Sequence, residues 1–220
     1  MKKVLVIAPH PDDETLGCGG TILKNKSEGS KVYWLILTSM QKKYGWNKNK
    51  IKKRELEIKK VNKMYGFSKK FELNFPTCRL ENFPISEIIE KISKVIKEIN
   101  PEIIYFPYSF DCHTDHQITA KALQACIKWF RFPSIKKVLM YETISETNFN
   151  FIDKNNFQPN VFIDISKFID KKINIMKIYK SEITSHPFPR NEKAIRSLAI
   201  IRGSQSGYFS AESFNLVLER

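Results

Sequence analysis

An α/β domain with a mainly parallel sheet is the fold that the sequence predicts. Two short β-branched runs, at residues 3–8 (KVLVIA) and 31–38 (KVYWLILT), are almost continuously apolar, which is typical of strands buried on both faces of a parallel sheet. The residues between them have the length of a crossover helix that ends at Gly29. A strand, a helix and a second strand in this order form a βαβ unit, from which parallel sheets are built.

The rest of the chain continues this alternation. The clearest helix is at residues 85–99, where isoleucine and valine recur with the spacing of one helical face and Pro101 follows as a stop. With no internal repeat and no linker, residues 1–220 are expected to form a single Rossmann-like domain of three layers, with helices on both faces of the sheet. The other predicted elements are strands over 103–107, 138–141 and 161–165 and helices over 50–65 (closed by Gly66), 115–130 and 166–184.

The composition restricts the class of protein. With 42% hydrophobic and 12% aromatic residues, the chain is too apolar to be disordered. Its first residues are apolar over too short a stretch for a signal peptide or a membrane span, so we expect a cytoplasmic protein with no integral membrane segment. The four cysteines form no CxxC pair, which indicates reduced thiols and neither a disulfide framework nor a cysteine-rich zinc module.

The net charge of +14 is concentrated in one segment. Residues 41–72 hold twelve basic and three acidic residues, so nine of the fourteen excess positive charges lie there. A local excess of this kind indicates either an anionic partner, such as nucleic acid, phospholipid or a phosphorylated small molecule, or a lysine-rich face in contact with solvent. Trp46 lies in this polar segment and is the tryptophan that we expect to be exposed near a ligand.

Residues suited to catalysis follow the first strand directly. His10, Asp12 and Asp13 lie in the sequence PHPDDE at the carboxyl end of that strand, where ligands bind in open parallel sheets. An imidazole and a carboxylate three residues apart can reach one metal ion, while the neighbouring aspartate points elsewhere and can act as a base. The alternative is a helix N-cap with a stabilising acidic first turn. We interpret Gly17 and Gly20, which follow, as sites of close packing between helix and sheet, because their spacing is not that of a phosphate-binding loop.

A second group of this kind follows the predicted strand at 103–107. The sequence DCHTDH at its carboxyl end contains Asp111, His113, Asp115 and His116. The fold would bring this group beside the first one. His10, Asp13 and His116 would then supply three nitrogen or oxygen ligands and leave a fourth position for water, which is the arrangement of a catalytic zinc site. Otherwise the histidines of this loop are hydrogen-bonding residues with no metal.

The motifs PHPDDE and DxHxDH together resemble the PIG-L/LmbE-like family of zinc-dependent N-deacetylases. Weaker similarities extend over nearly the whole chain, since Arg54 and Glu57 match the family's R-x-x-E helix and residues 179–182 and 202–214 resemble its C-terminal signatures. One departure is Glu182, at a position where the family often has glutamine. The resemblance implies an enzyme that removes acetyl groups from N-acetylglucosamine-type sugars.

The resemblance also implies roles for individual residues. Zinc would be held by His10, Asp13 and His116, with another divalent metal such as Fe²⁺ as the alternative. Asp12 would be the general base that takes a proton as water attacks the amide. His113 would stabilise the charge that develops on the carbonyl oxygen.

Three further residues are candidates for supporting roles. Asp111 and Asp115 can orient the metal-binding imidazoles from outside, as carboxylates near such histidines commonly do, or can cap loops. Arg54 can bind a hydroxyl or phosphate of the substrate, or can lie on the surface of its helix. The substrate is expected to be a small amino sugar, free or linked to a nucleotide or lipid, and the basic segment would favour a phosphorylated or otherwise anionic one.

Two other functions are compatible with part of the sequence. A nucleic-acid-binding protein could use residues 41–72, but the segment has no aromatic-interleaved RNA-binding motif, so we expect no nucleic-acid partner. A metal-dependent phosphoesterase usually needs two metals and more ligands than four histidines provide. The sequence leaves the oligomeric state open, including a homo-oligomer.

Overall fold

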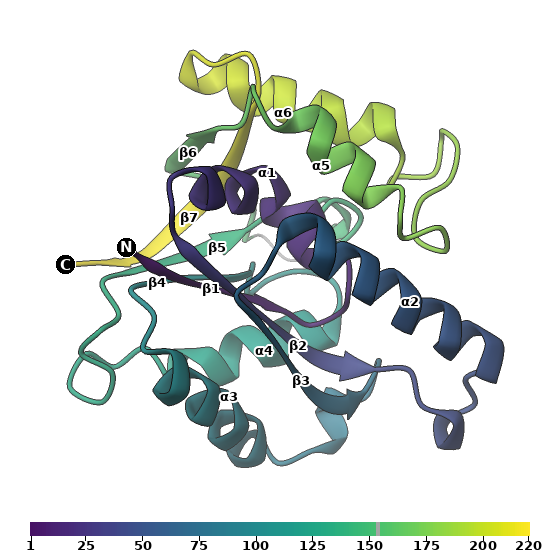
Figure 1. Ribbon diagram of the computed structural model, residues 1–220, viewed down its shortest axis with the longest axis vertical. Helices are drawn as coiled ribbons and strands as arrows, with labels where there is room; N and C mark the ends of the chain where they lie inside the picture. Colours follow the sequence, from purple (N-terminus) through teal and green to yellow (C-terminus); the bar gives the residue numbers. More distant parts are fainter. Residues whose placement is uncertain (153–154) are drawn as a thin grey trace.

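A seven-stranded mixed sheet forms the centre of the computed structural model, which describes residues 1–152 and 155–220 (Figure 1). The strand order is β3-β2-β1-β4-β5-β7-β6. The first five strands in this order are parallel, and β7 is antiparallel to both β5 and β6, which confirms the mainly parallel sheet. The strands are β1 (Lys3–Ala8), β2 (Lys31–Ser39), β3 (Lys69–Pro76), β4 (Ile103–Pro107), β5 (Lys137–Tyr141), β6 (Val161–Asp164) and β7 (Ala211–Glu219).

Helices cover both faces of this sheet, as predicted. One face is covered by α1 (Asp13–Ser27), α2 (Lys48–Tyr65), α5 (Ile169–Met176) and α6 (Glu192–Ser206), and the other by α3 (Ile85–Ile99) and α4 (Thr114–Gln124) (Figure 1). Short 3₁₀ turns occur at η1 (Lys42–Tyr44), η2 (Leu80–Asn82) and η3 (Thr147–Phe149). Two separate hydrophobic cores therefore lie above and below the sheet.

The central strand β1 shows why the sequence folds in this way. Its side chains alternate between the two cores, with Val4 and Val6 in one and Leu5 and Ile7 in the other. All four are fully buried. A strand with both faces covered needs apolar residues at every position, and this need explains the continuous run KVLVIA.

Two predicted helices end earlier than expected. The helix predicted over 115–130 ends at Gln124, because backbone bonds from Ala125 and Cys126 to residues three positions earlier tighten its last turn. The helix predicted over 166–184 is limited to α5, because a similar turn directs Tyr179 into the core, where its hydroxyl donates to Glu14 Oε1 at 2.9 Å.

Three elements have no counterpart among the predicted ones. These are β3, α6 and β7. Strand β3 lies at an edge of the sheet and carries charged residues on its exposed side, which is how edge strands avoid aggregation but which hides the apolar strand pattern. Only three residues of helix α6 are buried, Ile195, Ala199 and Gly203, so its apolar stripe is too narrow to be recognised in the sequence.

Close packing of α1 against its neighbours is confirmed at the glycines of this helix. A Cβ atom at Gly20 would lie 2.7 Å from Ile165 Cβ, and one at Gly17 would overlap the ring of Tyr141. We expect Gly20→Ala to lower the free energy of unfolding by about 1–3 kcal/mol, the usual range for an overpacked core, as measured by urea denaturation. Ser27→Ala, at the exposed end of α1, is the control, and an equal stability of both variants would contradict the packing argument.

Helix α1 consists of two segments, and Glu212, from β7, caps the second one. The helix departs from helical geometry at Cys18 (φ −143°, ψ 25°). The buried carboxylate of Glu212, on β7, accepts the backbone N–H groups of Gly20 at 2.8 Å and Thr21 at 2.7 Å. Lys172 balances its charge with an Nζ–Oε1 distance of 2.7 Å. Glu212 thus caps the second segment of α1 in the way that a side-chain acceptor caps a helix start.

Candidate functional site

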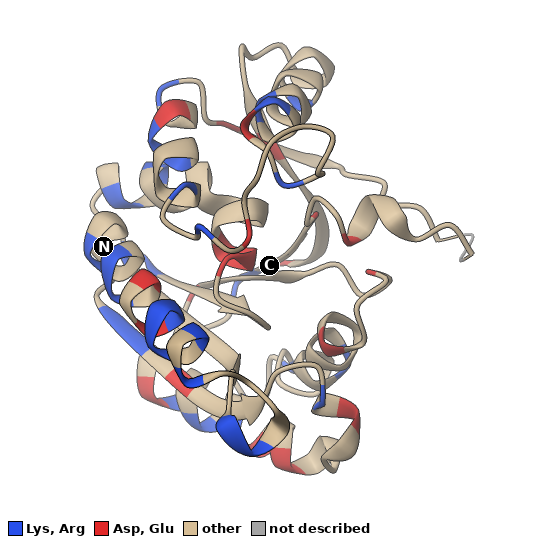
Figure 2. Cartoon of the chain, turned by 90° about the vertical axis from the view of Figure 1, so that its right-hand side faces the viewer, with Lys and Arg blue, Asp and Glu red and all other residues tan. Residues whose placement is uncertain are grey.

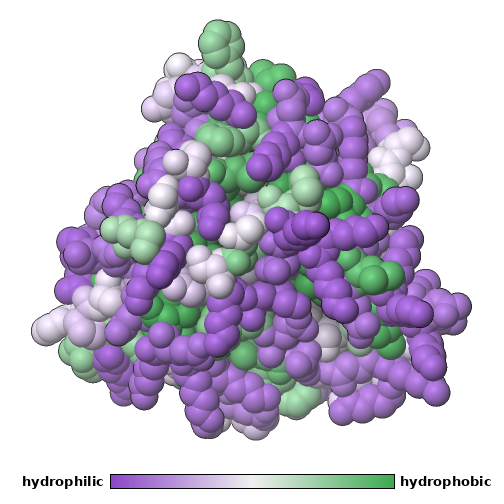
Figure 3. All heavy atoms as spheres, in the orientation of Figure 1, coloured by the Kyte–Doolittle hydropathy of each residue, from purple (hydrophilic) through white to green (hydrophobic). Residues whose placement is uncertain are grey.

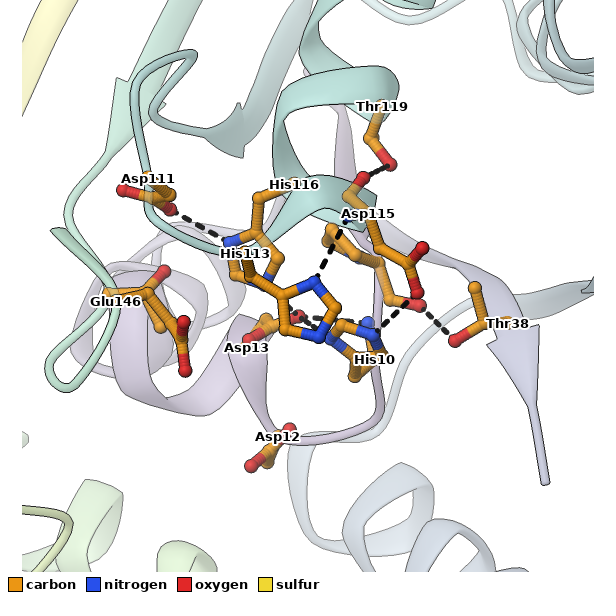
Figure 4. Close-up of polar contacts among 12 residues, drawn as sticks. His10, Asp12, Asp13, Thr38, Asp111, His113, Asp115, His116, Thr119 and Glu146 are labelled. Carbon is orange, nitrogen blue, oxygen red and sulfur yellow. Dashed lines mark hydrogen bonds and ion pairs between the residues drawn. The ribbon is translucent and has the colours of Figure 1, made fainter. Parts of the chain in front are cut away.

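The two groups of residues predicted from the sequence meet at the carboxyl edge of the sheet. His10, Asp12 and Asp13 follow β1, and the group Asp111–His116 follows β4, which pairs directly with β1. Figure 4 shows the rings of His10, His113 and His116 gathered around Asp13. The ring centroids of His10 and His113 are 4.5 Å apart, and those of His10 and His116 are 5.4 Å apart.

Three of these side chains are arranged as ligands of one metal ion. Asp13 Oδ2 lies 3.3 Å from His10 Nδ1 and 3.2 Å from His116 Nε2, and one ligand atom from each residue lies within 4.8 Å of the other two. His116 is fully buried, and its Nε2 atom has no hydrogen-bond partner. A buried polar atom without a partner is costly, and a cation between these atoms would remove that cost. The donor set therefore fits a divalent metal.

The far nitrogens of both histidines are held by carboxylates. His10 Nε2 lies 3.0 Å from Asp115 Oδ2, and His116 Nδ1 lies 2.8 Å from Asp111 Oδ2 (Figure 4). Asp115 also accepts the backbone N–H groups of Cys78 and Leu80, at 2.8 and 3.0 Å. These contacts fix the ring orientations and leave His10 Nδ1 and His116 Nε2 directed at Asp13, which is the usual outer support of metal-binding histidines.

The surroundings of this cluster favour positive charge. Burial alone would lower the pKa of His10, but hydrogen bonds to Asp115 and Asp13 outweigh it and raise the pKa to about 9. The pKa of His116 is likewise raised well above its ordinary value by Asp13 and Asp111, against the effect of burial. Burial would raise the pKa of Asp13, yet the adjacent histidines hold it well below the usual range. Such an electrostatic environment is suited to a cation.

Asp12 points into the cavity beside this cluster. It precedes α1 in an unusual backbone conformation (φ 133°, ψ −27°), in which its N–H donates to Glu14 Oε2 at 3.0 Å. Burial and, next, the charge of Asp13 raise the pKa of the Asp12 carboxyl to about 8, although Arg190 acts in the opposite direction. A carboxylate with a raised pKa is a stronger base.

His113 is held in one tautomer by the start of α4. Its Nδ1 accepts the backbone N–H of Asp115 at 3.0 Å, so the proton of the neutral ring is on Nε2. Burial and the neighbouring His10 and His116 lower the pKa of His113 to about 4. His113 therefore lines the cavity as a neutral hydrogen-bond donor. Its Nε2 is 3.6 Å from the thiol sulfur of Cys78, a neighbour that sequence reasoning did not identify.

Arg190 is a further site residue that sequence reasoning missed. Its Nη1 lies 3.0 Å from Asp12 Oδ2 and 3.0 Å from Glu182 Oε2, and its Nη2 lies 3.0 Å from Glu146 Oε1. Its Nε donates to Ser145 Oγ at 2.7 Å. Arg190 thus joins Asp12 to two loops that are far apart in the sequence. No local pattern marks such a residue, because all its partners are at least eight positions away. His186, in the same loop, is exposed.

Arg54 lies at the cavity with its guanidinium already bonded to protein groups. Its Nη1 donates to the carbonyl of Pro11 at 2.7 Å, and its Nη2 is paired with Glu182 and donates to Ser181 Oγ at 3.1 Å. Arg54 is buried. These contacts tie α2 to the turn that carries His10 and Asp12. Substrate binding by Arg54 stays a prediction.

A cavity of about 280 Å³ opens beside the histidines. It is lined by His10, Asp12, Asp13, His113 and His116 and by Trp46, which is half-buried. The sequence predicts Trp46 to be the exposed tryptophan, whereas the exposed one is Trp129, with 62% of its surface accessible. The lysines of residues 41–72 are not among the residues that line it. Nearly all of them are exposed, along the turn before α2, α2 itself and the start of β3 (Figure 2). The face seen in Figure 3 is largely hydrophilic, with apolar groups scattered on it. Within the described residues, no helix is both long and apolar enough to span a bilayer.

Residues 5–127 match the family PIG-L, described as GlcNAc-PI de-N-acetylase. The chain belongs to this family. Among its relatives is the diacetylchitobiose deacetylase of Thermococcus kodakarensis, with 26% identity over 99% of this chain and 84% of the relative. Another is the probable N-acetyl-alpha-D-glucosaminyl L-malate deacetylase 2 of Bacillus cereus, with 27% identity over 82% of this chain and 84% of the relative.

A solved structure resembles this chain over its whole length. The conserved protein TT1542 from Thermus thermophilus superposes with a TM-score of 0.79 and 26% identity, covering 100% of this chain and 98% of that one. The two motifs that suggested the family, PHPDDE and DCHTDH, both lie inside the matched residues 5–127. The family and the relatives support an N-deacetylase enzyme.

Proposed function

We propose that this protein hydrolyses the N-acetyl group of an N-acetylglucosamine-type sugar or sugar conjugate with the help of a divalent metal, zinc. The observation that carries the proposal is the convergence of His10, Asp13 and His116 on one point of the cavity, where the buried His116 Nε2 has no hydrogen-bond partner and lies 3.2 Å from Asp13 Oδ2. Nitrogen and oxygen ligands from three residues are typical of catalytic zinc. The deacetylase relatives act, by their names, on diacetylchitobiose and N-acetylglucosaminyl malate.

In this proposal the metal and the protein side chains divide the chemistry. A divalent ion held by His10, Asp13 and His116 supplies Lewis-acid polarisation of the amide carbonyl and makes water more acidic. Asp111 and Asp115, through their bonds to the far nitrogens, keep both imidazoles in the ligating orientation.

Asp12 would move the proton. Its carboxyl group lies at the cavity wall and has a pKa raised to about 8, so its ionised form is basic enough to take a proton from water as the water attacks the amide carbon. Once protonated, the same carboxyl can return the proton to the amine nitrogen as the C–N bond breaks. Acetate and the free amine are then the products.

His113 would act as a hydrogen-bond donor and not as the acid. Because Nδ1 accepts the Asp115 N–H, the proton on Nε2 is available to the developing oxyanion. A pKa lowered to about 4 means that the ring is neutral at pH 7, so it has no second proton to give to the leaving amine. Asp12, and not His113, is therefore the residue that we expect to protonate the leaving amine.

Acetate release tests the proposal directly. Purified protein is incubated with N-acetylglucosamine, N,N'-diacetylchitobiose and N-acetylglucosaminyl malate, with and without a chelator, and acetate is quantified. We expect acetate from at least one sugar, no acetate after chelation, and recovery when zinc is added back. Acetate release that persists after complete metal removal would contradict the metal-dependent mechanism.

Removal of the metal should also lower the stability of the fold. A ligand that binds only the folded state raises the free energy of unfolding by about 2.7 kcal/mol when its concentration is one hundred times Kd. We therefore expect a lower Tm for the chelated protein in a thermal melt and recovery with zinc. Comparing Zn²⁺, Fe²⁺ and Mn²⁺ in the recovery step identifies the preferred ion. An unchanged Tm with every ion would argue against the three-residue metal site.

A further inference from the structure

The cavity continues from the metal-ligand cluster along one side of α2. Ile51, Arg54, Glu55 and Ile58 all line it, with the i, i+3, i+4, i+7 spacing of a single helical face. The ends of β2 and β3 and the loop before α2 contribute the other lining residues of this part, Ile36, Thr38, Ser39, Met40, Trp46, Glu72, Asn74 and Thr77. This part has room for groups of the substrate that do not react.

Three residues, which we call the mouth residues, line the solvent-accessible part of this cavity. Trp46 is half-buried, and Glu55 and Glu72 are exposed. Glu72 is also paired with Lys70, which leaves one of its two oxygens outside that contact. An indole offers a flat apolar surface, and carboxylates accept hydrogen bonds from hydroxyl and ammonium groups. Together they match a sugar ring.

Apart from the metal ion and the histidines that would hold it, the charged side chains of the cavity wall are mostly acidic. Six carboxylates line it, those of Asp12, Asp13, Glu55, Glu72, Glu146 and Glu182. Within residues 1–152 and 155–220, no lysine lines it, and the arginines that do are Arg54 and Arg190. Both arginines are ion-paired with carboxylates of the same wall, Arg54 with Glu182 and Arg190 with Asp12, Glu146 and Glu182. Neither has a free charge to offer a phosphate.

Lys70 pairs with Glu72 at the cavity mouth, but no lysine of the basic segment is among the described residues that line the cavity. Of the residues of this segment, those that line the cavity are Trp46, Ile51, Arg54, Glu55, Ile58 and Glu72, while Lys52 and Lys53 on the same helix are exposed and lie outside the lining. Charges on an exposed face are screened over about 8 Å at physiological ionic strength. The sequence pattern that favoured an anionic substrate therefore describes the outside of α2 and not the site.

We infer that the mouth residues form a subsite for a second, uncharged or amino-bearing sugar, and that the enzyme selects against substrates with a phosphate or carboxylate at this position. The inference rests on the proposed function, because it names the substrate class of that same cavity. His116, whose Nε2 faces Asp13, lines the same cavity, so the subsite and the reacting centre belong to one continuous space.

Matched substrates test the inference. N-acetylglucosamine and its 6-phosphate differ only in the phosphate group, and N,N'-diacetylchitobiose adds a second ring. We expect kcat/KM for N-acetylglucosamine to exceed that for the 6-phosphate at least tenfold, and the disaccharide to have a lower KM than the monosaccharide. Added salt should reduce the difference in kcat/KM between N-acetylglucosamine and its 6-phosphate, because salt screens the repulsion between like charges.

Variants of the mouth residues test whether these residues determine the choice of substrate. Trp46→Ala should raise KM for the disaccharide about tenfold with little change in kcat, and Glu55→Gln with Glu72→Gln should reduce the discrimination against the 6-phosphate to a few-fold. Lys52→Gln with Lys53→Gln, on the outer face of α2, is the matched control and should change no constant. A loss of activity on the 6-phosphate in this control would show that the lysines bind substrate and would overturn the inference.

Binding separates this inference from the proposed function. Isothermal titration of the Asp12→Asn protein with N,N'-diacetylchitobiose and with N-acetylglucosamine 6-phosphate measures affinity without turnover. Selective binding of the uncharged sugar with no acetate release by the wild type would support the subsite and refute the deacetylation. Acetate release with equal kcat/KM for both monosaccharides, or tighter binding of the 6-phosphate, would refute the subsite and leave the deacetylation standing.

Discussion

Replacing Asp12 with asparagine is expected to reduce kcat by about 10²- to 10⁴-fold, the usual contribution of a general acid and base, while metal content is unchanged. The amide keeps the size of the carboxylate and can accept a hydrogen bond from Arg190, but it cannot take up a proton. Asparagine is also the residue best able to replace aspartate at the positive φ of this position (133°), so the turn should persist. Acetate release and elemental analysis of the purified variant measure the two quantities.

Acetate release and metal content must be measured together to distinguish a general base from a metal ligand. Asp13→Asn is the matched comparison, because it makes the same chemical change one residue later, at a carboxylate that contacts both His10 and His116. We expect this second variant to lose metal as well as activity. Full activity of Asp12→Asn, or metal loss equal to that of Asp13→Asn, would refute the assignment of Asp12 as the base.

Replacing His116 with alanine is expected to remove the metal and, with it, essentially all activity. His116 is fully buried and offers its Nε2 to the cluster while Asp111 holds its Nδ1. Without the ring, a divalent ion retains two protein ligands, fewer than the three of a typical catalytic site. Metal content after dialysis, measured by elemental analysis, should fall to near zero.

Two further variants distinguish the loss of a metal ligand from a general loss of folding. His186→Ala removes an exposed loop histidine and should retain full metal content. Asp111→Asn keeps the His116 ring but weakens its outer support, so metal affinity should fall by about 10–100-fold in a folded protein, as judged by circular dichroism. Full metal occupancy in His116→Ala would rule out the ligand role.

The site was predictable where chemistry and topology act over short stretches of sequence. His10 and Asp13 follow one buried strand and His116 follows another, and the carboxyl ends of parallel neighbours must lie together. The position of β1 could be read because a strand covered on both faces allows only apolar residues. Strand β3, at the sheet edge, has no such constraint, and its pattern was not recognised.

Residues that act through long-range contacts could not be predicted. Arg190 meets Asp12 across 178 positions and Glu146 across 44, and nothing in the sequence around it reports either contact. The charge of residues 41–72 left two interpretations open for a related reason, because composition counts lysines without showing which side of α2 they occupy. Structure separates Arg54 and Glu55, which line the cavity, from Lys52 and Lys53, which do not.

The cap that Glu212 provides to α1 has a consequence for the order of folding during synthesis. The helix that begins at Asp13, beside the candidate reacting groups, leaves the ribosome long before Glu212 and the strand that carries it. Strand β5 also lacks its antiparallel neighbour until then. Contacts of such wide sequence separation form slowly, so a nascent chain stalled before residue 211 should hold the metal-ligand motifs in an incompletely ordered, protease-sensitive form. Catalysis at this site would therefore have to wait for the synthesis of residues 211–219.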